Sequence, residues 1–348
     1  MLVWTDVRIR DRRAECTAAA ELWTGIYNSE AVISGNLNLS KTCIEVMEQL
    51  ISPKLVARAI GVSESSVKRW CDRGLLQMVR TAGGHRRMKL DAVIEFIRQT
   101  GQTLVEPELL GLPSCGSSLE RTLERALPIL VSALAAGEER IARQLVLEMY
   151  LGGQGVQRIC DEMLTKCLHQ IGSMWEHSQL EIYQERRACE ILLRILHEVR
   201  KLLPPLSPDA PFALGGTVSG DPYQLPTIMV ELCLREAGWR AESFGTNLPL
   251  ATMAAAVQQS SPRLCWLSVS YLADLEAFLR DFKEFAQITR EQGTVLLIGG
   301  QALTQEVRRE LDYAAYCDSF RHVVQLAESL RSSLTRMPAA VPLTVPTV

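Results

Sequence analysis

SPKLVARAIGVSESSVKRWCDRGLLQMVRTAGGHRR, residues 52–87, predicts two short helices joined by a tight turn and followed by a basic hairpin. Ser52 is a favourable N-cap for the first helix, because its side-chain oxygen accepts a bond from an unpaired backbone N–H. Gly61 permits the turn, Ser63 caps the second helix, and Gly74 ends it. The stretch therefore predicts a helix-turn-helix followed by a wing.

The second helix, residues 64–72, has two distinct faces. Val67 and Trp70 are three positions apart and are expected to point inward. The outward face carries small polar side chains and cations, which suit base edges and phosphates in a major groove. These candidate DNA contacts are Ser65, Ser66, Lys68 and Arg69.

The hairpin after the second helix is basic at its tip. Residues 78–80 form one expected strand, a Gly-Gly pair permits a turn with positive φ, and residues 85–88 form the return. Such a wing grips phosphates or a minor groove. Its candidate contacts are Arg80, His85, Arg86 and Arg87. The alternative is an arginine-rich solvated surface on an ordinary pair of helices.

Residues 50–98 resemble the winged DNA-binding domain of the MerR family. The features that carry the resemblance are Trp70, Asp72, Arg73, Gly74 and the sequence RTAGGHRR at 80–87. The resemblance implies that four arginines contact DNA: Arg69, Arg80, Arg86 and Arg87. Because one winged helix reads only half of an operator, we expect a homodimer or homotetramer on double-stranded DNA.

Charge and composition narrow the class of protein. Residues 47–100 hold ten lysines and arginines and five acidic residues, whereas the whole chain has a net charge of −3. A basic module on an acidic body suits nucleic-acid binding on one face. The ten cysteines have no metal-ligand spacing, and no apolar run is long enough to span a membrane. We therefore expect a cytoplasmic protein with reduced thiols.

Enzymatic motifs are missing from the sequence. It contains no P-loop, no metal-ligand cluster and no nucleophile paired with a base. We therefore expect neither catalytic residues nor an enzyme.

Composition and periodicity divide the chain into segments. Met47 directly precedes the first folded module, so the leader before it is expected to be a mis-annotated start or a disordered arm. Clusters of Gly, Pro and Ser mark linkers. The segments are a leader at 1–46, the winged helix at 47–100, a linker at 101–118, a helical bundle at 119–205, an α/β domain at 212–333 and a flexible tail at 334–348.

The bundle segment has helical periodicity throughout. Short loops between its helices imply antiparallel neighbours, hence a four-helix bundle. The expected helices are 119–136, 139–150, 156–175 and 181–203.

The α/β segment alternates between short strand-like runs and amphipathic helices. This alternation predicts a doubly wound, flavodoxin-like parallel sheet with ligands at the carboxyl ends of its strands. The expected helices are 225–237, 249–259, 273–292 and 301–311. The fold class is thus multidomain: winged helix, four-helix bundle and doubly wound α/β domain.

This order of modules resembles the CarH and LitR group of MerR-type repressors. Those proteins sense light through adenosylcobalamin, so the resemblance implies a cobalt-containing cofactor and a photoreceptor role. In that group the bundle carries Trp-x9-Glu-His, which caps the upper face of the cobalamin. The matching positions here are Trp175, Glu185 and Arg186. The other interpretation of Trp175 is a core aromatic side chain at a helix end.

The residues expected below the cofactor depart further from the pattern of that group. Cobalamin domains of this type carry (Asp/Glu)-x-His-x-x-Gly after the first strand. Here Asp221 is kept, Tyr223 replaces the cobalt-binding histidine, and Pro226 replaces the glycine. A neutral phenol is a poor metal ligand, so no metal-ligating residue is expected.

Two further pairs of residues occupy positions of the cofactor-binding pattern of the group. Ser268 keeps the serine of the Ser-x-Leu pattern that lines the nucleotide tail of the cofactor, and Ser270 takes the place of its leucine. Gly299 and Gly300 match the paired glycines after the fourth strand.

Three interpretations of the α/β domain follow. It binds cobalamin without a protein axial ligand, or it binds another tetrapyrrole, or its pocket is vestigial and it serves dimerisation or a protein partner. For the whole chain we expect a DNA-binding regulator in which ligand controls oligomerisation and DNA binding. The alternatives are a ligand-free regulator and a corrinoid-dependent methyltransferase component. The last of these has no need of a winged helix.

Overall fold

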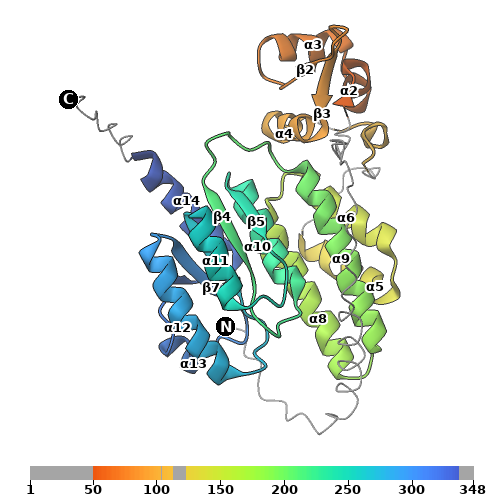
Figure 1. Ribbon diagram of the computed structural model, residues 1–348. Helices are drawn as coiled ribbons and strands as arrows, with labels where there is room; N and C mark the ends of the chain where they lie inside the picture. Colours follow the sequence, from red (N-terminus) through yellow and green to blue (C-terminus); the bar gives the residue numbers. More distant parts are fainter. Residues whose placement is uncertain (1–49, 103, 113–122, 337–348) are drawn as a thin grey trace, which may run out of the picture. The chain divides into compact units, whose positions relative to one another are not determined.

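The computed structural model describes residues 50–102, 104–112 and 123–336. The expected leader at 1–46, part of the expected linker and the tail beyond residue 336 lie outside the described residues. Along the described chain, a winged helix is followed by helices and then by an α/β domain (Figure 1). This order confirms the multidomain fold class.

The winged helix is built from helices and a small antiparallel sheet. Its two helix caps form as expected, because Ser52 Oγ accepts a bond from Leu55 N–H at 3.3 Å and Ser63 Oγ from Ser66 N–H at 3.2 Å. The sheet has the order β1-β3-β2. The elements are β1 (Leu50–Ile51), α2 (Pro53–Ala59), α3 (Glu64–Asp72), β2 (Val79–Arg80), β3 (Arg86–Lys89) and α4 (Leu90–Thr100).

Part of the expected linker packs against the winged helix. Residues 107–110 form a 3-10 helix, η1 (Pro107–Leu110). Val105 and Glu106 both donate their backbone N–H to the carbonyl oxygen of Ala59, at 2.7 and 3.1 Å. Arg58 pairs with Glu106 at 3.0 Å. The chain from 104 to 112 therefore extends the winged helix, which differs from the expected free linker at 101–118.

The helical bundle confirms the expected periodicity. The third expected helix is continuous but contains a π-helical turn, and a capping box between Glu181 and Gln184 starts the last one. The elements are α5 (Leu123–Ala136), α6 (Glu139–Leu151), α7 (Val156–Ile159), η2 (Cys160–Leu164), α8 (Thr165–Glu176) and α9 (Ile182–Leu202).

The α/β domain has a parallel sheet in the order β5-β4-β6-β7-β8, which is the flavodoxin-like order. Two elements were not expected from the sequence, the short strand β8 and the last helix α14. The elements are β4 (Phe212–Thr217), α10 (Gln224–Glu236), β5 (Arg240–Ser243), α11 (Leu250–Ser260), β6 (Leu264–Ser268), α12 (Leu275–Glu291), β7 (Val295–Gly299), α13 (Gln305–Arg309), β8 (Ala315–Tyr316) and α14 (Phe320–Arg336). The expected tail from 334 thus begins as helix.

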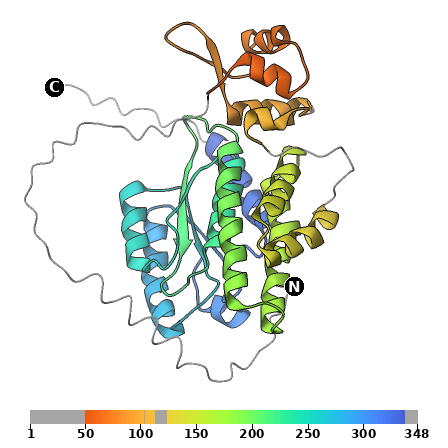
Figure 2. The ribbon, with the colours of Figure 1, turned by 90° about the vertical axis from the view of Figure 1, so that its right-hand side faces the viewer.

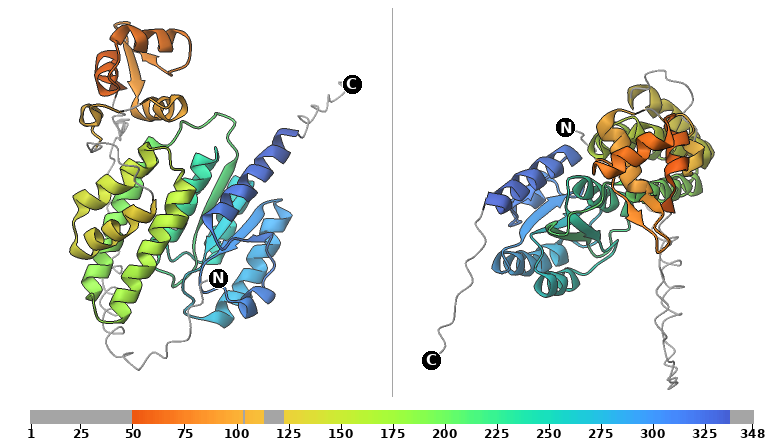
Figure 3. Two further views of the ribbon diagram at one scale, coloured as in Figure 1. Left: turned by 180° about the vertical axis from the view of Figure 1, so that it is seen from behind. Right: turned by 90° about the horizontal axis from the view of Figure 1, so that it is seen from above.

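Helices cover both faces of this sheet. One face packs against apolar side chains of α11 and α12, and the other against side chains of α10 and α14. Figure 3 shows α14 from behind, on the side opposite to α12. On its other side α10 buries Ile228, Met229 and Leu232 in the same core as the bundle. The helix α10 therefore lies between the sheet and the bundle (Figure 2).

Two carboxylates fasten the bundle to the α/β domain. Asp161 of the bundle accepts bonds from the backbone N–H groups of Phe320 and Arg321, at 2.8 and 2.9 Å, and so caps α14. Glu236 of α10 accepts a bond from Val156 N–H at 2.6 Å and so caps α7. Each carboxylate faces the positive end of a helix dipole, where a negative charge stabilises the helix.

The same glutamate also holds the winged helix. Arg98 on α4 donates to Glu236 Oε1 at 3.1 Å and to the carbonyl oxygen of Gln154 at 3.3 Å. Its guanidinium lies 4.0 Å from the centre of the buried Tyr150 ring. The pair is mostly buried, so it is less screened by water than a surface ion pair.

Candidate DNA interface and ligand-binding edge

The outward face of α3 carries the predicted base contacts. Ser65 Oγ and Ser66 Oγ lie 2.8 and 2.9 Å from Ser63 Oγ, so both hydroxyls join the cap of the helix. Lys68 pairs with Glu64 at 2.7 Å, one turn earlier. Arg69 is exposed, and among the residues that the structure describes no carboxylate pairs with it. Its guanidinium can therefore reach a base edge without first breaking an ion pair.

The wing forms as a two-stranded ribbon beside α3. Arg80 of β2 lies opposite Arg86 of β3. Thr81 closes the turn, because its N–H donates to the carbonyl oxygen of His85 at 3.0 Å and its own carbonyl oxygen accepts from Gly84 N–H at 2.8 Å. Arg80 and His85 are exposed on this ribbon, where phosphates can approach them.

The remaining two arginines of the predicted set are engaged within the domain. Arg86 donates to Asp72 Oδ1 at 2.6 Å, which links the wing to the end of α3. Arg87 donates to the carbonyl oxygen of Arg86 at 2.9 Å, and both side chains are half-buried. Arg86 thus positions the wing, and its predicted contact with DNA remains a prediction.

Asp221 organises the carboxyl edge of the sheet. Its side chain is fully buried and accepts bonds from the backbone N–H groups of Tyr223 at 3.0 Å, Ser270 at 2.6 Å and Tyr271 at 3.3 Å. Burial raises the pKa of Asp221, and these N–H groups oppose the rise because they stabilise the charged form. Asp221 therefore ties the loop after β4 to the loop after β6.

Tyr223 stands where the group has its cobalt-binding histidine. It lies near Glu185 and Arg186 of the bundle, which match the motif above the cofactor. Burial raises the pKa of Tyr223 above its usual value; the charge of Arg186 lowers it and that of Glu185 raises it. The phenol is therefore neutral at physiological pH. Glu185 accepts a bond from Cys189 Sγ at 3.3 Å, and Arg186 Nε lies 3.6 Å from Glu185 Oε2. The structure thus brings these predicted residues of the two domains into electrostatic range.

Trp175 is not a core side chain, which answers the alternative left open by the sequence. It lies near the end of α8 and is 45% exposed. In Figure 1 this end of α8 and the start of α9 lie toward the same end of the molecule as the carboxyl end of β4.

The predicted serines and glycines serve backbone packing at this edge. Ser268 is buried at the end of β6, and Ser270 gives its N–H to Asp221. A side chain at Gly300, where φ is 123°, would collide with the backbone of Val269. A side chain at Gly299 would lie 2.7 Å from the carbonyl oxygen of Cys317. These glycines therefore allow close approach of neighbouring loops.

Two aromatic side chains at the same edge were not predicted from the sequence. Phe244 follows β5 and Tyr271 follows β6, and they are 42% and 49% exposed, similar to Tyr223 at 41%. Because β5, β4 and β6 are neighbours in the sheet, the three aromatic residues follow adjacent strands. An aromatic residue in the loop after each of these three strands was the signal that the sequence offered.

These residues do not fit a cobalamin ligated by the protein. Tyr223 offers a neutral phenol, and Asp221, which in the expected pattern would accompany a histidine, is occupied by backbone N–H groups. Within the described residues, no group of three or more His, Cys, Asp or Glu side chains could hold a metal ion. The exposed aromatic residues do suit a flat ring system, which stacks on such side chains.

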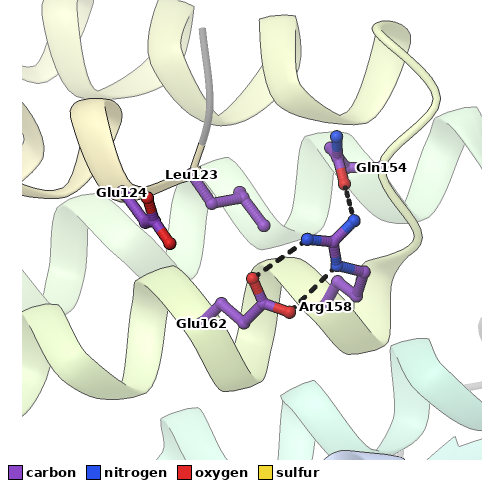
Figure 4. A pocket seen from close by; sticks show the side chains of 5 residues that line it. All are labelled: Leu123, Glu124, Gln154, Arg158 and Glu162. Carbon is purple, nitrogen blue, oxygen red and sulfur yellow. Dashed lines mark hydrogen bonds and ion pairs between the residues drawn. The ribbon is translucent and has the colours of Figure 1, made fainter.

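One pocket lies elsewhere, in the helical bundle (Figure 4). It has a volume of about 270 Å³ and is lined by Leu123, Glu124, Gln154, Arg158 and Glu162. Arg158 donates to both Glu162 oxygens, at 2.9 and 3.1 Å, and to Gln154 Oε1 at 2.9 Å. The polar side chains of the pocket are thus largely paired with one another.

No helix in the described ranges is long and apolar enough to cross a membrane.

We expect the substitution Asp221→Ala to loosen the edge without unfolding the domain. It would leave the part-buried N–H groups of Ser270 and Tyr271 without their acceptor, at a cost of about 1 kcal/mol. Hydrogen exchange should therefore become faster at these amides. Asp274→Ala is the control, because Asp274 caps α12 through Ala277 N–H at 2.9 Å. Unchanged exchange at 270–271 in Asp221→Ala would contradict the role of this carboxylate.

Two families match separate parts of the chain, and one known protein is similar over most of it. Residues 50–101 match the family described as "Helix-turn-helix domain", and residues 129–199 match the family described as "B12 binding domain". The chain is 22% identical over 293 residues to the HTH-type transcriptional repressor CarA of Myxococcus xanthus, a match that spans 81% of this chain and 98% of that protein.

Corrinoid proteins are more distant relatives of the C-terminal part. Dimethylamine corrinoid protein 1 of Methanosarcina acetivorans is 20% identical over 178 residues, 49% of this chain and 82% of that protein. The structure of the Methanosarcina barkeri monomethylamine corrinoid protein superposes with a TM-score of 0.52 at 12% identity, covering 60% of this chain and 100% of that one. That likeness shows the fold of the bundle and the sheet. The matches to the two domain families and the similarity to CarA together make the chain resemble CarH-like regulators of the MerR type, with a C-terminal region similar to cobalamin-binding proteins.

Proposed function

We propose that this regulator recognises an operator as a homodimer or homotetramer and that a ligand at the carboxyl edge of its sheet controls that binding. The recognition surface is the outward face of α3, with Ser65, Ser66, Lys68 and Arg69. Arg80 and His85 of the wing add phosphate contacts. Arg86 holds the wing to α3, and Arg86 and Arg87 add positive charge to the same ribbon.

The ligand we propose is a flat tetrapyrrole-type molecule, with cobalamin as the first candidate. Its support is the B12-type bundle and the aromatic side chains Tyr223, Phe244 and Tyr271 that follow adjacent strands. Glu185 and Arg186 offer charge from the bundle side. A ligand in contact with these bundle residues and with the aromatic side chains of the sheet would hold the bundle against the sheet. It would so favour one arrangement of the chain over others.

A single observation carries the link between ligand and DNA. The helix α10 follows Tyr223 directly at its N-terminus and ends at Glu236, which accepts bonds from Arg98 of the winged helix and from Val156 of the bundle. A displacement of α10 at the ligand edge would therefore change the contacts of the winged helix. The second candidate is a ligand-free regulator whose α/β domain serves a partner or dimerisation. Its support is the lack of a histidine at position 223.

For DNA binding, we expect Arg69→Ala to raise the Kd for the operator about 5- to 150-fold, which corresponds to about 1–3 kcal/mol for a base contact. The operator is the fragment that the wild-type protein selects from random DNA. Fluorescence anisotropy at fixed salt measures the Kd. Arg280→Ala is the control, because it removes the same charge from the exposed surface of α12. Equal affinity of Arg69→Ala and wild type would contradict the proposed docking.

For ligand control, we expect the protein incubated with adenosylcobalamin in the dark to retain the corrin absorption band on gel filtration and to change its elution volume. Trp175→Ala should respond more weakly, because Trp175 is an exposed aromatic side chain of the bundle. Ile129→Ala, which removes another exposed apolar side chain, is the control. A colourless protein with unchanged elution would contradict ligand control by cobalamin and favour the second candidate. A full response of Trp175→Ala would remove Trp175 from the mechanism.

A further inference from the structure

The interior directly below the carboxyl edge is filled on both faces of the sheet. Gly215 and Gly216 are consecutive residues of β4, so they open toward opposite faces. A side-chain carbon at Gly215 would collide with the indole of Trp266. A side-chain carbon at Gly216 would lie 3.0 Å from the carbonyl oxygen of Gly245 and 3.2 Å from Leu248. Even one methyl group therefore has no free space here.

Trp266 is fixed in this position by its hydrogen bond as well as by packing. The side chain is 2% exposed, and its Nε1–H donates to Thr227 Oγ1 at 3.0 Å. Thr227 belongs to the first turn of α10, and its hydroxyl lies 3.1 Å from Ser243 Oγ at the end of β5. The indole thus spans from β6 to the first turn of α10, the helix that begins directly after Tyr223. Turning it away would leave the buried indole N–H without an acceptor, which is unfavourable.

The neighbouring space on both faces is packed as well. On the same face Trp239 is fully buried, and its Nε1–H donates to the carbonyl oxygen of Ala327 at 3.2 Å. On the opposite face Phe278 and Phe282 pack with ring centres 5.5 Å apart. Close packing of this kind resists the insertion of an additional ring system.

A corrinoid can hold its nucleotide tail in two ways. The tail either folds under the corrin ring, with its benzimidazole on the cobalt, or extends away from the ring into the protein. The extended form needs a slot in the protein and another lower ligand for the cobalt. In this chain the neutral phenol of Tyr223 is a poor lower ligand. The indole of Trp266 fills the space below the edge that a slot would need.

We propose that Trp266 closes the interior of the α/β domain to such a tail, so that the site takes a tetrapyrrole-type ligand that rests entirely on the edge. The inference rests on the proposed function, in which this edge holds the ligand. Tyr223, Phe244 and Tyr271 then supply the surface on which the ring lies. Recognition depends on the ring and its substituents, and a nucleotide tail adds no contact within the sheet.

The test compares two probes on the full-length protein, cobinamide, which has no nucleotide tail, and methylcobalamin, which has one. We expect dissociation constants within about threefold of each other, measured by equilibrium dialysis in the dark. We also expect bound methylcobalamin to keep the absorption spectrum of its free, base-on form. Binding of methylcobalamin more than tenfold tighter than cobinamide, or with a base-off spectrum, would overturn the inference while leaving the proposed function intact.

Absence of binding by both corrinoids is a separate outcome, and it would overturn the corrinoid ligand of the proposed function together with this inference. Variants of Trp266 sharpen the positive result. Trp266→Ala opens space below the edge; combined with Tyr223→His, which adds a lower ligand, it should shift bound methylcobalamin toward the base-off form, whereas Trp266→Phe combined with Tyr223→His keeps a ring there and should not. If Trp266→Ala fails to fold, the comparison of the two probes on the wild-type protein decides the matter by itself.

Discussion

The carboxylate of Glu236 holds together regions that are distant in the sequence. One oxygen accepts from the N-terminus of α7, and the other accepts from Arg98 of the winged helix. The helix that carries this residue packs on the sheet with one side and on the bundle with the other. Loss of this carboxylate would leave Arg98 without its ion-pair partner and the N–H of Val156, at the start of α7, without its acceptor.

A second constraint acts at the other end of α10. Asp221 gathers the loops after β4 and β6 through backbone N–H groups, and Trp266 fixes the first turn of the helix from below. The carboxyl edge is thus a rigid surface with exposed aromatic side chains above and a packed interior beneath. Such an edge suits recognition of a flat ligand from one side. Because the edge is closely packed against α10, a displacement at the edge would also displace α10.

The sequence was sufficient to predict what depends on local pattern. The helix caps at Ser52 and Ser63 form as expected, and so do the bundle and the parallel sheet, because capping and hydrophobic periodicity act over a few residues. The replacement of a histidine by Tyr223 was also visible in the sequence, and the raised pKa of the partly exposed phenol keeps it neutral, which makes it a poor cobalt ligand. The exposure of Trp175 needed the structure, because a tryptophan at a helix end suits a core and a surface equally.

Contacts over long sequence distances were not predictable in this way. Asp161 caps a helix that begins 159 residues later, and nothing near Asp161 in the sequence indicates that partner. The same holds for Ala59, whose carbonyl oxygen holds residues 105 and 106, and for the pairing of β1 with β3. Arg86 was expected on phosphate from its place in a basic run, but its bond to Asp72 depends on how the wing folds back on α3.

The most direct test of the link through α10 is hydrogen–deuterium exchange of the full chain carrying Glu236→Ala. We predict faster exchange in α4 and at the start of α7, with unchanged exchange in α12. Glu291→Ala is the matched control, because Glu291 is exposed and accepts a bond from Gln287 of its own helix at 2.8 Å. If exchange in α4 and α7 stayed at the wild-type rate, α10 would not connect the ligand edge to the winged helix, and the central claim would be wrong.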